Sequence, residues 1–235
     1  MNVKICGISR DRDVELLARL PVDHVGLWYG VPGGHADLAL PTFLRLGAAV
    51  QRSRSLLPVL VTLSGDAEAL AQVVRASGVR RVQLHGYQTP AMISALKASA
   101  PDGLWILKGL HVRGRACTER PSLIRAYEKA GVDAFLVDAS ADDGRVGSTG
   151  RSLEGDTVWS LVEEFTLPFL LAGGISAQGC AQHQLPVHHP RFLGIDLDTN
   201  ARGPDGRLCP HRIEAVSHAW RSCHDEGQQH ARQLH

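Results

Sequence analysis

The feature that most constrains the fold is an alternation, repeated along the chain, of short apolar runs with longer amphipathic stretches. The apolar runs are rich in Val, Ile, Leu and Phe, with little strict alternation of apolar and polar residues, which is typical of parallel strands buried on both faces. Eight such runs occur, at residues 3–6, 24–28, 56–63, 81–84, 105–110, 134–138, 168–172 and 192–196. Each predicts a strand, and the stretches between them have room for helices.

The amphipathic stretches carry helix signals. In residues 66–77 the apolar side chains fall on one face, and Asp66 stands where an N-cap is expected. Residues 11–20 carry a similar apolar stripe. Gly78 and Gly131 each stand between a predicted helix and a strand, where glycine accepts the left-handed conformation that ends a helix. Together these patterns predict an α/β protein, a (β/α)8 TIM barrel. An open doubly wound sheet is the alternative, and no G-x-G-x-x-G motif supports it.

The length of 235 residues suits one barrel, which we place at residues 1–223 as a single catalytic domain. Residues 224–235 are polar and rich in glutamine, and we expect them to form a tail that frays. Two segments interrupt the alternation, at residues 29–40 and 139–154. Both follow a predicted strand, so both are expected on the face where barrel enzymes place their catalytic residues.

Composition narrows the classes of function. The formal net charge of +1 and the scattered Lys and Arg residues argue against a nucleic-acid or anionic-membrane surface. No run approaches the roughly 20 apolar residues that span a bilayer, and the first residues lack the pattern of a secretory leader. The five cysteines are widely spaced, without a C-x-x-C pair. We therefore expect reduced thiols in the cytoplasm rather than a metal site or a disulfide framework.

Five motifs follow in order along the chain. Residues 4–8 read KICGI, 82–86 read VQLHG, 136–138 read LVD, 147–150 read GSTG and 171–175 read LAGGI. In this order and at these spacings they resemble the phosphoribosylanthranilate isomerase family, from residue 3 to residue 220. The glycine pair alone is common to many phosphate-binding barrels. The specific signal is the combination of the KICG start, the QLHG motif and the later aspartate.

The resemblance implies an Amadori rearrangement in tryptophan biosynthesis, without cofactor or metal. N-(5-phosphoribosyl)anthranilate becomes a 1-deoxyribulose 5-phosphate derivative. This chemistry needs an acid that protonates the ring oxygen, so that the furanose opens to a protonated imine, and a base that removes the proton from C2. In the family a cysteine of the first strand is the base and an aspartate that ends the sixth is the acid. The resemblance assigns these roles to Cys6 and Asp138.

The two groups make opposite demands on their surroundings. Cys6 must lose its proton near neutral pH, so we expect cationic or helix N-terminal groups that stabilise a thiolate. Asp138 must hold a proton, and the apolar residues 135–137 before it suit that requirement. As alternatives, Cys6 is a small buried core residue, and Asp138 is a carboxylate hydrogen-bonded to a loop backbone.

Other polar residues and glycines near the strand ends are candidates for binding the substrate. Lys4 and Gln83 are expected to orient it, although Lys4 could equally pair with a buried carboxylate. For His85 and Lys108 a structural role is an equal alternative. The predicted substrate-binding residues are Lys4, Gln83, His85, His35, Gly150, Gly173, Gly174, Asp198, Thr199 and Asn200.

Three segments depart from the family pattern. The family's second loop carries a Ser-x-Arg element that meets the anthranilate side, whereas residues 29–37 contain no arginine and His35 is the cationic substitute. The family's DVSSGVE reads DLDTNAR at residues 196–202. Asp198 would repel a phosphate by on the order of 4 kcal/mol at contact range, unless Arg202 offsets it. Residues 208–209, Leu-Cys, replace a Lys-Asp pair at the entry to the last helix.

Three functions follow from these observations. The first is the family's isomerase, whose substrate is a small aryl glycosylamine. The second is a repurposed isomerase with the same mechanism, acting on a related glycosylamine without phosphate, which Asp198 and the missing arginine favour. The third is a binding protein without turnover, which the presence of both Cys6 and Asp138 disfavours. The loop changes are equally compatible with ordinary drift in a working enzyme, because loops tolerate change. The sequence does not predict the oligomeric state.

Overall fold

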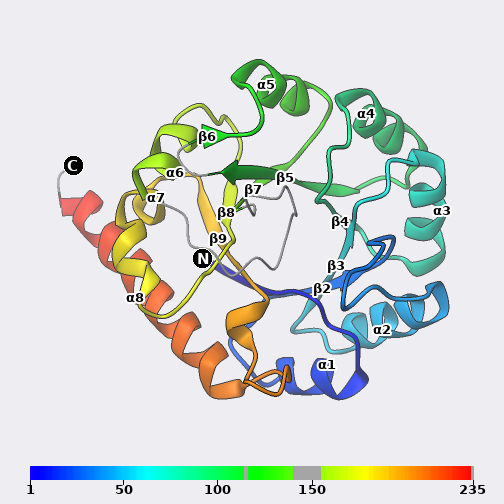
Figure 1. Ribbon diagram of the computed structural model, residues 1–235, viewed down its shortest axis with the longest axis horizontal. Coiled ribbons are helices and arrows are strands. Elements are labelled where there is room, and N and C mark those ends of the chain that lie inside the picture. The colour runs from blue at the N-terminus through cyan, green and yellow to red at the C-terminus, as the bar shows by residue number, and fades with distance from the viewer. Residues whose placement is uncertain (114–115, 140–154, 234–235) are drawn as a thin grey trace.

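The computed structural model describes residues 1–113, 116–139 and 155–233, and a closed ring of strands forms its centre (Figure 1). Within these residues nine strands belong to one sheet. They are β1 (Asn2–Ile5), β2 (His24–Trp28), β3 (Leu57–Thr62), β4 (Arg81–Leu84), β5 (Trp105–Arg113), β6 (Ala116–Cys117), β7 (Ala134–Ala139), β8 (Phe169–Leu171) and β9 (Phe192–Leu197).

Eight of the described strands run parallel and close on themselves. Their order is β4-β3-β2-β1-β9-β8-β7-β5, and a further pairing of β4 with β5 completes the ring. In the register of β1, Lys4 stands opposite His24 on one side and Asp196 on the other. Because the strands are parallel, their C-terminal ends meet at one rim. The predicted (β/α)8 barrel is confirmed, and the open sheet is excluded.

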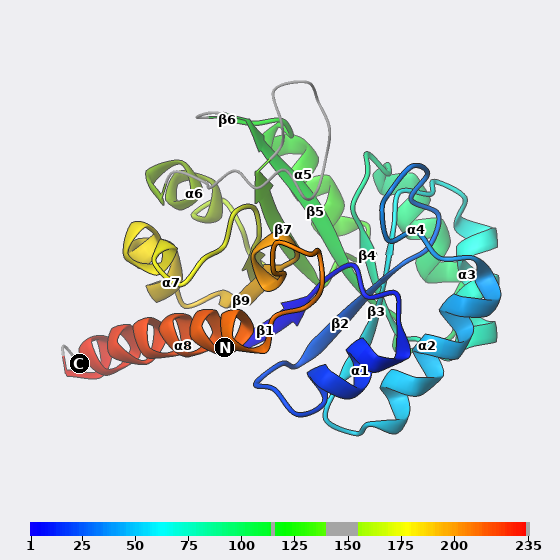
Figure 2. The same cartoon turned by 60° about the horizontal axis from the view of Figure 1, so that its bottom comes forward.

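Helices surround the ring of strands (Figures 1 and 2). Asp66 caps α3 as predicted, since its side chain accepts a hydrogen bond from the backbone N–H of Ala69 at 3.0 Å, and Gly78 ends the helix at φ 69°. The helices are α1 (Asp11–Leu17), α2 (Leu40–Arg52), α3 (Ala67–Ser77), α4 (Pro90–Ser99), α5 (Pro121–Lys129), α6 (Gly155–Val162), α7 (Gln184–His188) and α8 (Pro210–Gln233), with short 3-10 turns η1 (Gly179–His183) and η2 (Thr199–Ala201).

The strand side chains divide between two environments. Those that point outward, such as Val3 and Ile5, join the large apolar core between the strands and the helices. Those that point inward form smaller apolar clusters, one of which contains Cys6 and Trp28. Because side chains alternate along a strand, the outward direction of Val3 and Ile5 turns Lys4 and Cys6 into the barrel. Lys4 in β1 and Cys6 just after it therefore both place a reactive side chain inside the barrel.

Two elements differ from the sequence prediction. β5 continues beyond residue 110 to Arg113 and pairs antiparallel with β6, with Val112 opposite Cys117. A strand of two residues is too short to leave a periodic pattern, so β6 was not predicted. The tail was expected to fray from residue 224, but α8 continues through it to Gln233. No helix in the described ranges combines the length and apolar character needed to cross a membrane.

The expectation that all thiols are reduced is wrong at one pair. A disulfide joins Cys180 in η1 to Cys223 in α8, whereas Cys6, Cys117 and Cys209 are free. The two paired cysteines are 43 residues apart in the chain. They meet because η1 packs against α8, a contact between distant segments that cysteine spacing does not reveal.

Candidate active site

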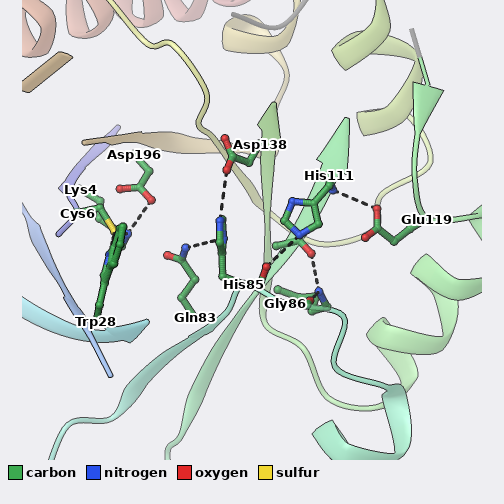
Figure 3. A network of polar contacts seen from close by, with 12 residues as sticks. Lys4, Cys6, Trp28, Gln83, His85, Gly86, His111, Glu119, Asp138 and Asp196 are labelled. Carbon is green, nitrogen blue, oxygen red and sulfur yellow. Dashed lines mark hydrogen bonds and ion pairs between the residues drawn. The ribbon is translucent and has the colours of Figure 1, made fainter. Parts of the chain in front are cut away.

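The first part of the site surrounds Cys6, which follows β1 at the C-terminal rim (Figure 3). Its Sγ accepts hydrogen bonds from Lys4 Nζ at 3.3 Å and from Trp28 Nε1 at 3.1 Å. Lys4 Nζ also forms an ion pair with Asp196 Oδ2 at 2.7 Å. All four side chains are buried, and they come from the adjacent strands β9, β1 and β2 or the residue that follows β1. A thiol, an ammonium and a carboxylate are thus buried together inside the barrel.

Burial is the largest single influence on the pKa of both Cys6 and Lys4. It raises the pKa of Cys6 to about 12; the charge of Lys4 lowers that pKa, and those of Asp196 and Asp198 raise it. For Lys4, burial lowers the pKa, but Asp196 and Cys6 outweigh burial and the pKa is raised. The predicted cationic neighbour is therefore present, as Lys4. The expectation that the thiol ionises near neutral pH is nevertheless wrong for the free protein, because one ammonium does not offset burial and two carboxylates.

The second part of the site is built on Asp138, one residue before the end of β7. Its Oδ2 lies 3.4 Å from His85 Nε2, and His85 Nδ1 lies 3.1 Å from Gln83 Nε2 (Figure 3). With this amide orientation Nδ1 is the acceptor, so Nε2 carries the proton that faces the carboxylate. Asp138 is buried and follows an apolar strand, as the sequence indicated. Gln83 thus holds one side of the His85 ring, and the other side of that ring faces the Asp138 carboxylate.

Gly173 is needed for the loop after β8 to approach this carboxylate. Its φ is +77°, a left-handed conformation, and a Cβ at this position would lie 3.0 Å from Asp138 Oδ1 and 2.6 Å from the backbone nitrogen of Ala139. A larger residue would therefore collide with the end of β7. Gly174 follows with φ 64°. Two consecutive left-handed glycines bring backbone close to the site.

His111 contacts His85 and was not identified from the sequence. Its Nε2–H donates to the carbonyl oxygen of His85 at 3.0 Å, and its backbone N–H donates to Glu119 Oε2 at 3.1 Å. Its ring meets those of His85 and Tyr87 edge-on. Burial, aided by the charge of His85, lowers the pKa of His111 to about 4. In the pairing of β5 with β7, His111 stands opposite Asp138. A prediction that extended β5 past residue 110 would therefore have placed His111 beside Asp138.

Lys108 takes the structural role that the sequence left open. Its Nζ donates to the carbonyl oxygens of Gly86 at 2.7 Å and Gly109 at 2.6 Å. The ammonium also lies 5.0 Å from the ring centroid of Tyr127 in α5. Burial lowers the pKa of Lys108 to about 8. These contacts tie β4, β5 and α5 together and lie on the outer side of the barrel wall.

The two divergent loops meet at the rim around Asp198. Arg202 Nε pairs with Asp198 Oδ1 at 2.8 Å, and His35 Nε2 lies 3.6 Å from Asp198 Oδ2. Arg202 Nη2 also donates to the carbonyl oxygens of Cys6 at 3.2 Å and Gly7 at 2.7 Å. The carboxylate therefore faces a guanidinium that is anchored to the end of β1. The sequence left open whether Arg202 offsets the negative charge of Asp198, and this ion pair shows that it does.

The remaining predicted substrate-binding residues occupy the same rim or fall outside the described ranges. Asn200 Nδ2 donates to the carbonyl oxygen of Ile175 at 2.8 Å, so it braces the loop after β8. Thr199 is exposed at the start of η2, and His35 packs edge-on against Trp28 with 4.8 Å between ring centroids. Gly150 lies outside the described residues.

Three further residues of the site escaped the sequence analysis. Trp28 and Asp196 end their predicted strands, and only the alternation of side chains around Lys4 and Cys6 could have indicated that both point inward. Gly26 is the third. A Cβ there would lie 2.7 Å from Cys6 Sγ and 3.1 Å from Lys4 Nζ, so the space occupied by the thiol depends on this glycine.

Comparisons with known proteins agree with this geometry. A family model described as N-(5'-phosphoribosyl)anthranilate (PRA) isomerase matches residues 3–200. The N-(5'-phosphoribosyl)anthranilate isomerase 2 of Methanosarcina mazei is 31% identical over 210 residues, which are 88% of this chain and 88% of the relative. An N-(5'-phosphoribosyl)anthranilate isomerase of Synechococcus sp. is 32% identical over 231 residues, 96% of this chain and 91% of the relative.

The solved structures agree in fold. The crystal structure of phosphoribosyl anthranilate isomerase from Thermus thermophilus aligns with a TM-score of 0.74 and 22% identity, covering 94% of this chain and 99% of that one. The family resemblance of the KICG, QLHG and glycine-pair motifs is therefore confirmed across nearly the whole barrel. This chain belongs to the N-(5'-phosphoribosyl)anthranilate isomerase family.

Proposed function

We propose that this chain converts N-(5'-phosphoribosyl)anthranilate into 1-(o-carboxyphenylamino)-1-deoxyribulose 5-phosphate, a step of tryptophan biosynthesis. The observation that carries the proposal is the meeting of Cys6 and Asp138 at one rim, each with its own buried polar partners (Figure 3). A phosphoribosyl anthranilate isomerase of the same fold has been solved in complex with the reduced form of that product, at a TM-score of 0.67 and 17% identity. That complex supports a small-molecule substrate.

Asp138 acts in this proposal as the general acid. It gives its proton to the ring oxygen, the bond between that oxygen and C1 breaks, and the amine lone pair forms a protonated imine at C1. His85 Nε2–H, 3.4 Å away, stabilises the carboxylate that remains. Gln83 fixes the histidine tautomer from the other side of the ring. The apolar strand before Asp138 keeps water away from the proton that is transferred.

Cys6 acts as the base once the imine has formed. The pKa of about 12 describes the free protein, in which burial opposes a thiolate. A protonated imine beside Sγ adds a buried positive charge and lowers that pKa. The thiol then releases its proton to solvent, and the thiolate takes the proton from C2 to give the enolamine. The ketone forms when C1 takes a proton from solvent and the proton of the C2 hydroxyl returns to Asp138. Lys4 and Trp28 donate to Sγ throughout, so both favour the thiolate.

The electrostatic argument for a substrate without phosphate is weaker than the sequence alone suggested. It depended on the charge at Asp198 and on the missing arginine of the second loop, and only the first concerns the phosphate. Arg202 is paired with the Asp198 carboxylate at 2.8 Å. An ion pair presents far less net charge to an approaching phosphate than a lone carboxylate does. The left-handed backbone at Gly173 and Gly174 keeps the amide side of the phosphate site. A phosphorylated substrate is therefore the one that this rim supports.

The test is complementation of a tryptophan auxotroph that lacks this isomerase, together with turnover of N-(5'-phosphoribosyl)anthranilate by the purified chain. Growth and turnover are expected for the wild type. The variant Asp138→Asn, which keeps the shape of the side chain but cannot supply a carboxylic proton, serves as the matched negative control. A folded wild-type protein that neither restores growth nor turns over the phosphorylated substrate would overturn the proposal.

A further inference from the structure

A cavity of about 170 Å³ opens at the N-terminal end of the barrel, where the strands begin. His24, Arg81 and Trp105 are the first residues of β2, β4 and β5, and all three line it. The candidate active site lies at the other end, where the strands finish. An engineered apolar cavity of about 150 Å³ holds one benzene molecule, so this one has room for a single six-membered ring.

Arg81 brings an unmatched positive charge to the cavity. Its guanidinium lies over the indole of Trp105, 6.0 Å from the ring centroid, and the two residues stand opposite each other in the register of β4 and β5. Within the described part of the chain no carboxylate pairs with Arg81. The side chain is half-buried. A guanidinium that is partly desolvated and lies over an aromatic ring is well prepared to bind an anion.

His24 brings an unmatched polar atom. Its Nδ1 is buried and has no hydrogen-bond partner among the described residues. Burial, with the nearby charge of Arg81, lowers the pKa of His24 to about 4, so the imidazole is neutral at pH 7. A neutral imidazole can still place one N–H toward an acceptor. Buried polar atoms are rarely left without a partner, so this atom indicates a ligand or an ordered water in the cavity.

Asn2 and Lys4 also line the cavity, and the ammonium of Lys4 is already paired with Asp196 at 2.7 Å. The rest of the wall is apolar and decides what kind of anion fits. Val59, Leu107 and Leu170 line the cavity between the polar residues. Because Lys4 is paired with Asp196, a phosphate dianion would have one free cation among the described lining residues, Arg81, for its two charges. It would also lie against aliphatic side chains, which solvate charge poorly. A single carboxylate matches one guanidinium with two parallel hydrogen bonds. Its apolar part would fill the remaining volume against these walls and the indole.

We propose that this cavity binds a small apolar monocarboxylate, with one ring or a branched chain of similar size. The carboxylate of the ligand accepts hydrogen bonds from the guanidinium of Arg81 and from His24. The apolar part packs against Trp105 and the aliphatic wall. This site shares Lys4 with the candidate active site but opens at the opposite end of the barrel, and the proposal does not rest on the isomerase activity.

Calorimetric titration with benzoate tests the proposal on the whole chain, with benzamide as the uncharged probe of the same shape. Benzoate is expected to bind at one site per chain, and benzamide at least about tenfold more weakly, the range that a charge-assisted hydrogen bond spans. Inorganic phosphate is titrated in parallel. Tighter binding of phosphate than of benzoate would overturn the assignment to a monocarboxylate.

Two variants locate the binding. Arg81→Met keeps an apolar stem over Trp105 and removes the charge, so benzoate affinity should fall at least about tenfold. Arg80→Met is the matched control, since Arg80 is exposed and donates instead to the carbonyl oxygen of Asp102. Melting temperatures confirm that both variants fold. Unchanged affinity in Arg81→Met would overturn the proposal, as would benzoate binding that saturating reduced 1-(o-carboxyphenylamino)-1-deoxyribulose 5-phosphate abolishes.

Discussion

Among single residues, Cys6 has the most unusual surroundings, because it combines hydrogen-bond donors that favour a thiolate with burial that opposes one. The pKa of about 12 means that almost none of the thiol is ionised at pH 8 in the free protein. We expect iodoacetamide to alkylate Cys6 at pH 8 at least about 100-fold more slowly than free cysteine, since only the thiolate reacts. Peptide mass spectrometry separates Cys6 from the free thiols of Cys117 and Cys209. Rapid alkylation of Cys6 would show that Lys4 dominates its electrostatics.

The acid and base assignments predict losses in turnover without loss of the fold. Cys6→Ala and Asp138→Asn should each lower kcat by roughly 10²–10⁴-fold, the usual contribution of a positioned acid or base. Cys6→Ser should also be slow, because an alcohol is far less acidic than a thiol. Steady-state kinetics and melting temperatures measure the two effects separately. A variant with near-normal kcat would remove its residue from the mechanism.

Asp198 should tune the affinity for the phosphorylated substrate. Asp198→Asn leaves the guanidinium of Arg202 unpaired at the rim, so the local charge becomes more positive and KM for N-(5'-phosphoribosyl)anthranilate should fall several-fold. Arg202→Gln removes one positive charge from beside the carboxylate, and KM should rise by a similar factor. Both shifts should shrink as ionic strength increases. Equal KM values in the two variants would mean that this ion pair does not face the phosphate.

At the scale of elements, β2 shapes the base site through a missing side chain. A Cβ at Gly26 would stand 2.7 Å from Cys6 Sγ and 3.1 Å from Lys4 Nζ, so Gly26→Ala must displace one of them. We expect kcat to fall at least about tenfold, because a displacement of this size spoils the alignment of a proton transfer. Gly65→Ala is the matched control, with no atom within 4 Å of its added Cβ. Equal kcat in both variants would show that the thiol tolerates displacement.

The elements that sequence patterns predicted well are those with a local physical cause. The parallel strands needed a run of apolar residues, and α3 needed only an amphipathic face with Asp66 and Gly78 at its ends. β6 exists because the extended end of β5 offers it a partner, and no property of its two residues requires a strand. The continuation of α8 past residue 224 also ran against local composition, since the tail is polar and contains Gly227.

At the scale of the whole molecule, the motifs identified the reacting residues but not their electrostatics. Cys6 and Asp138 were found because each stands in a recognisable segment. The protonation of Cys6 depends on Asp196 and Asp198, which are nearly 200 positions away in the chain and reach the thiol only after the barrel closes between β1 and β9. The disulfide of Cys180 with Cys223 arises in the same way. Patterns within one element are readable from sequence, whereas charges brought together by closure are not.

Two histidines, His24 and His111, predict how the stability of the whole molecule depends on pH. Burial lowers the pKa of His24 and of His111 to about 4, against an ordinary value of 6.5. Between pH 6.5 and about 4 the unfolded chain therefore binds more protons at these positions than the folded protein does. Their contribution to the free energy of unfolding is complete above pH 6.5 and is lost as the pH falls through this window.

We expect the midpoint of urea unfolding to fall steadily from pH 7 to pH 4. Exchange of a histidine for glutamine removes the titrating group, so His24→Gln and His111→Gln should each flatten this dependence, even if they lower stability at pH 7. His218→Gln, at an exposed position on α8, is the matched control. Carboxylates also titrate in this range, and the comparison with wild type cancels their effect, because every variant retains them. Parallel curves for all four proteins would mean that neither imidazole is held neutral by the fold.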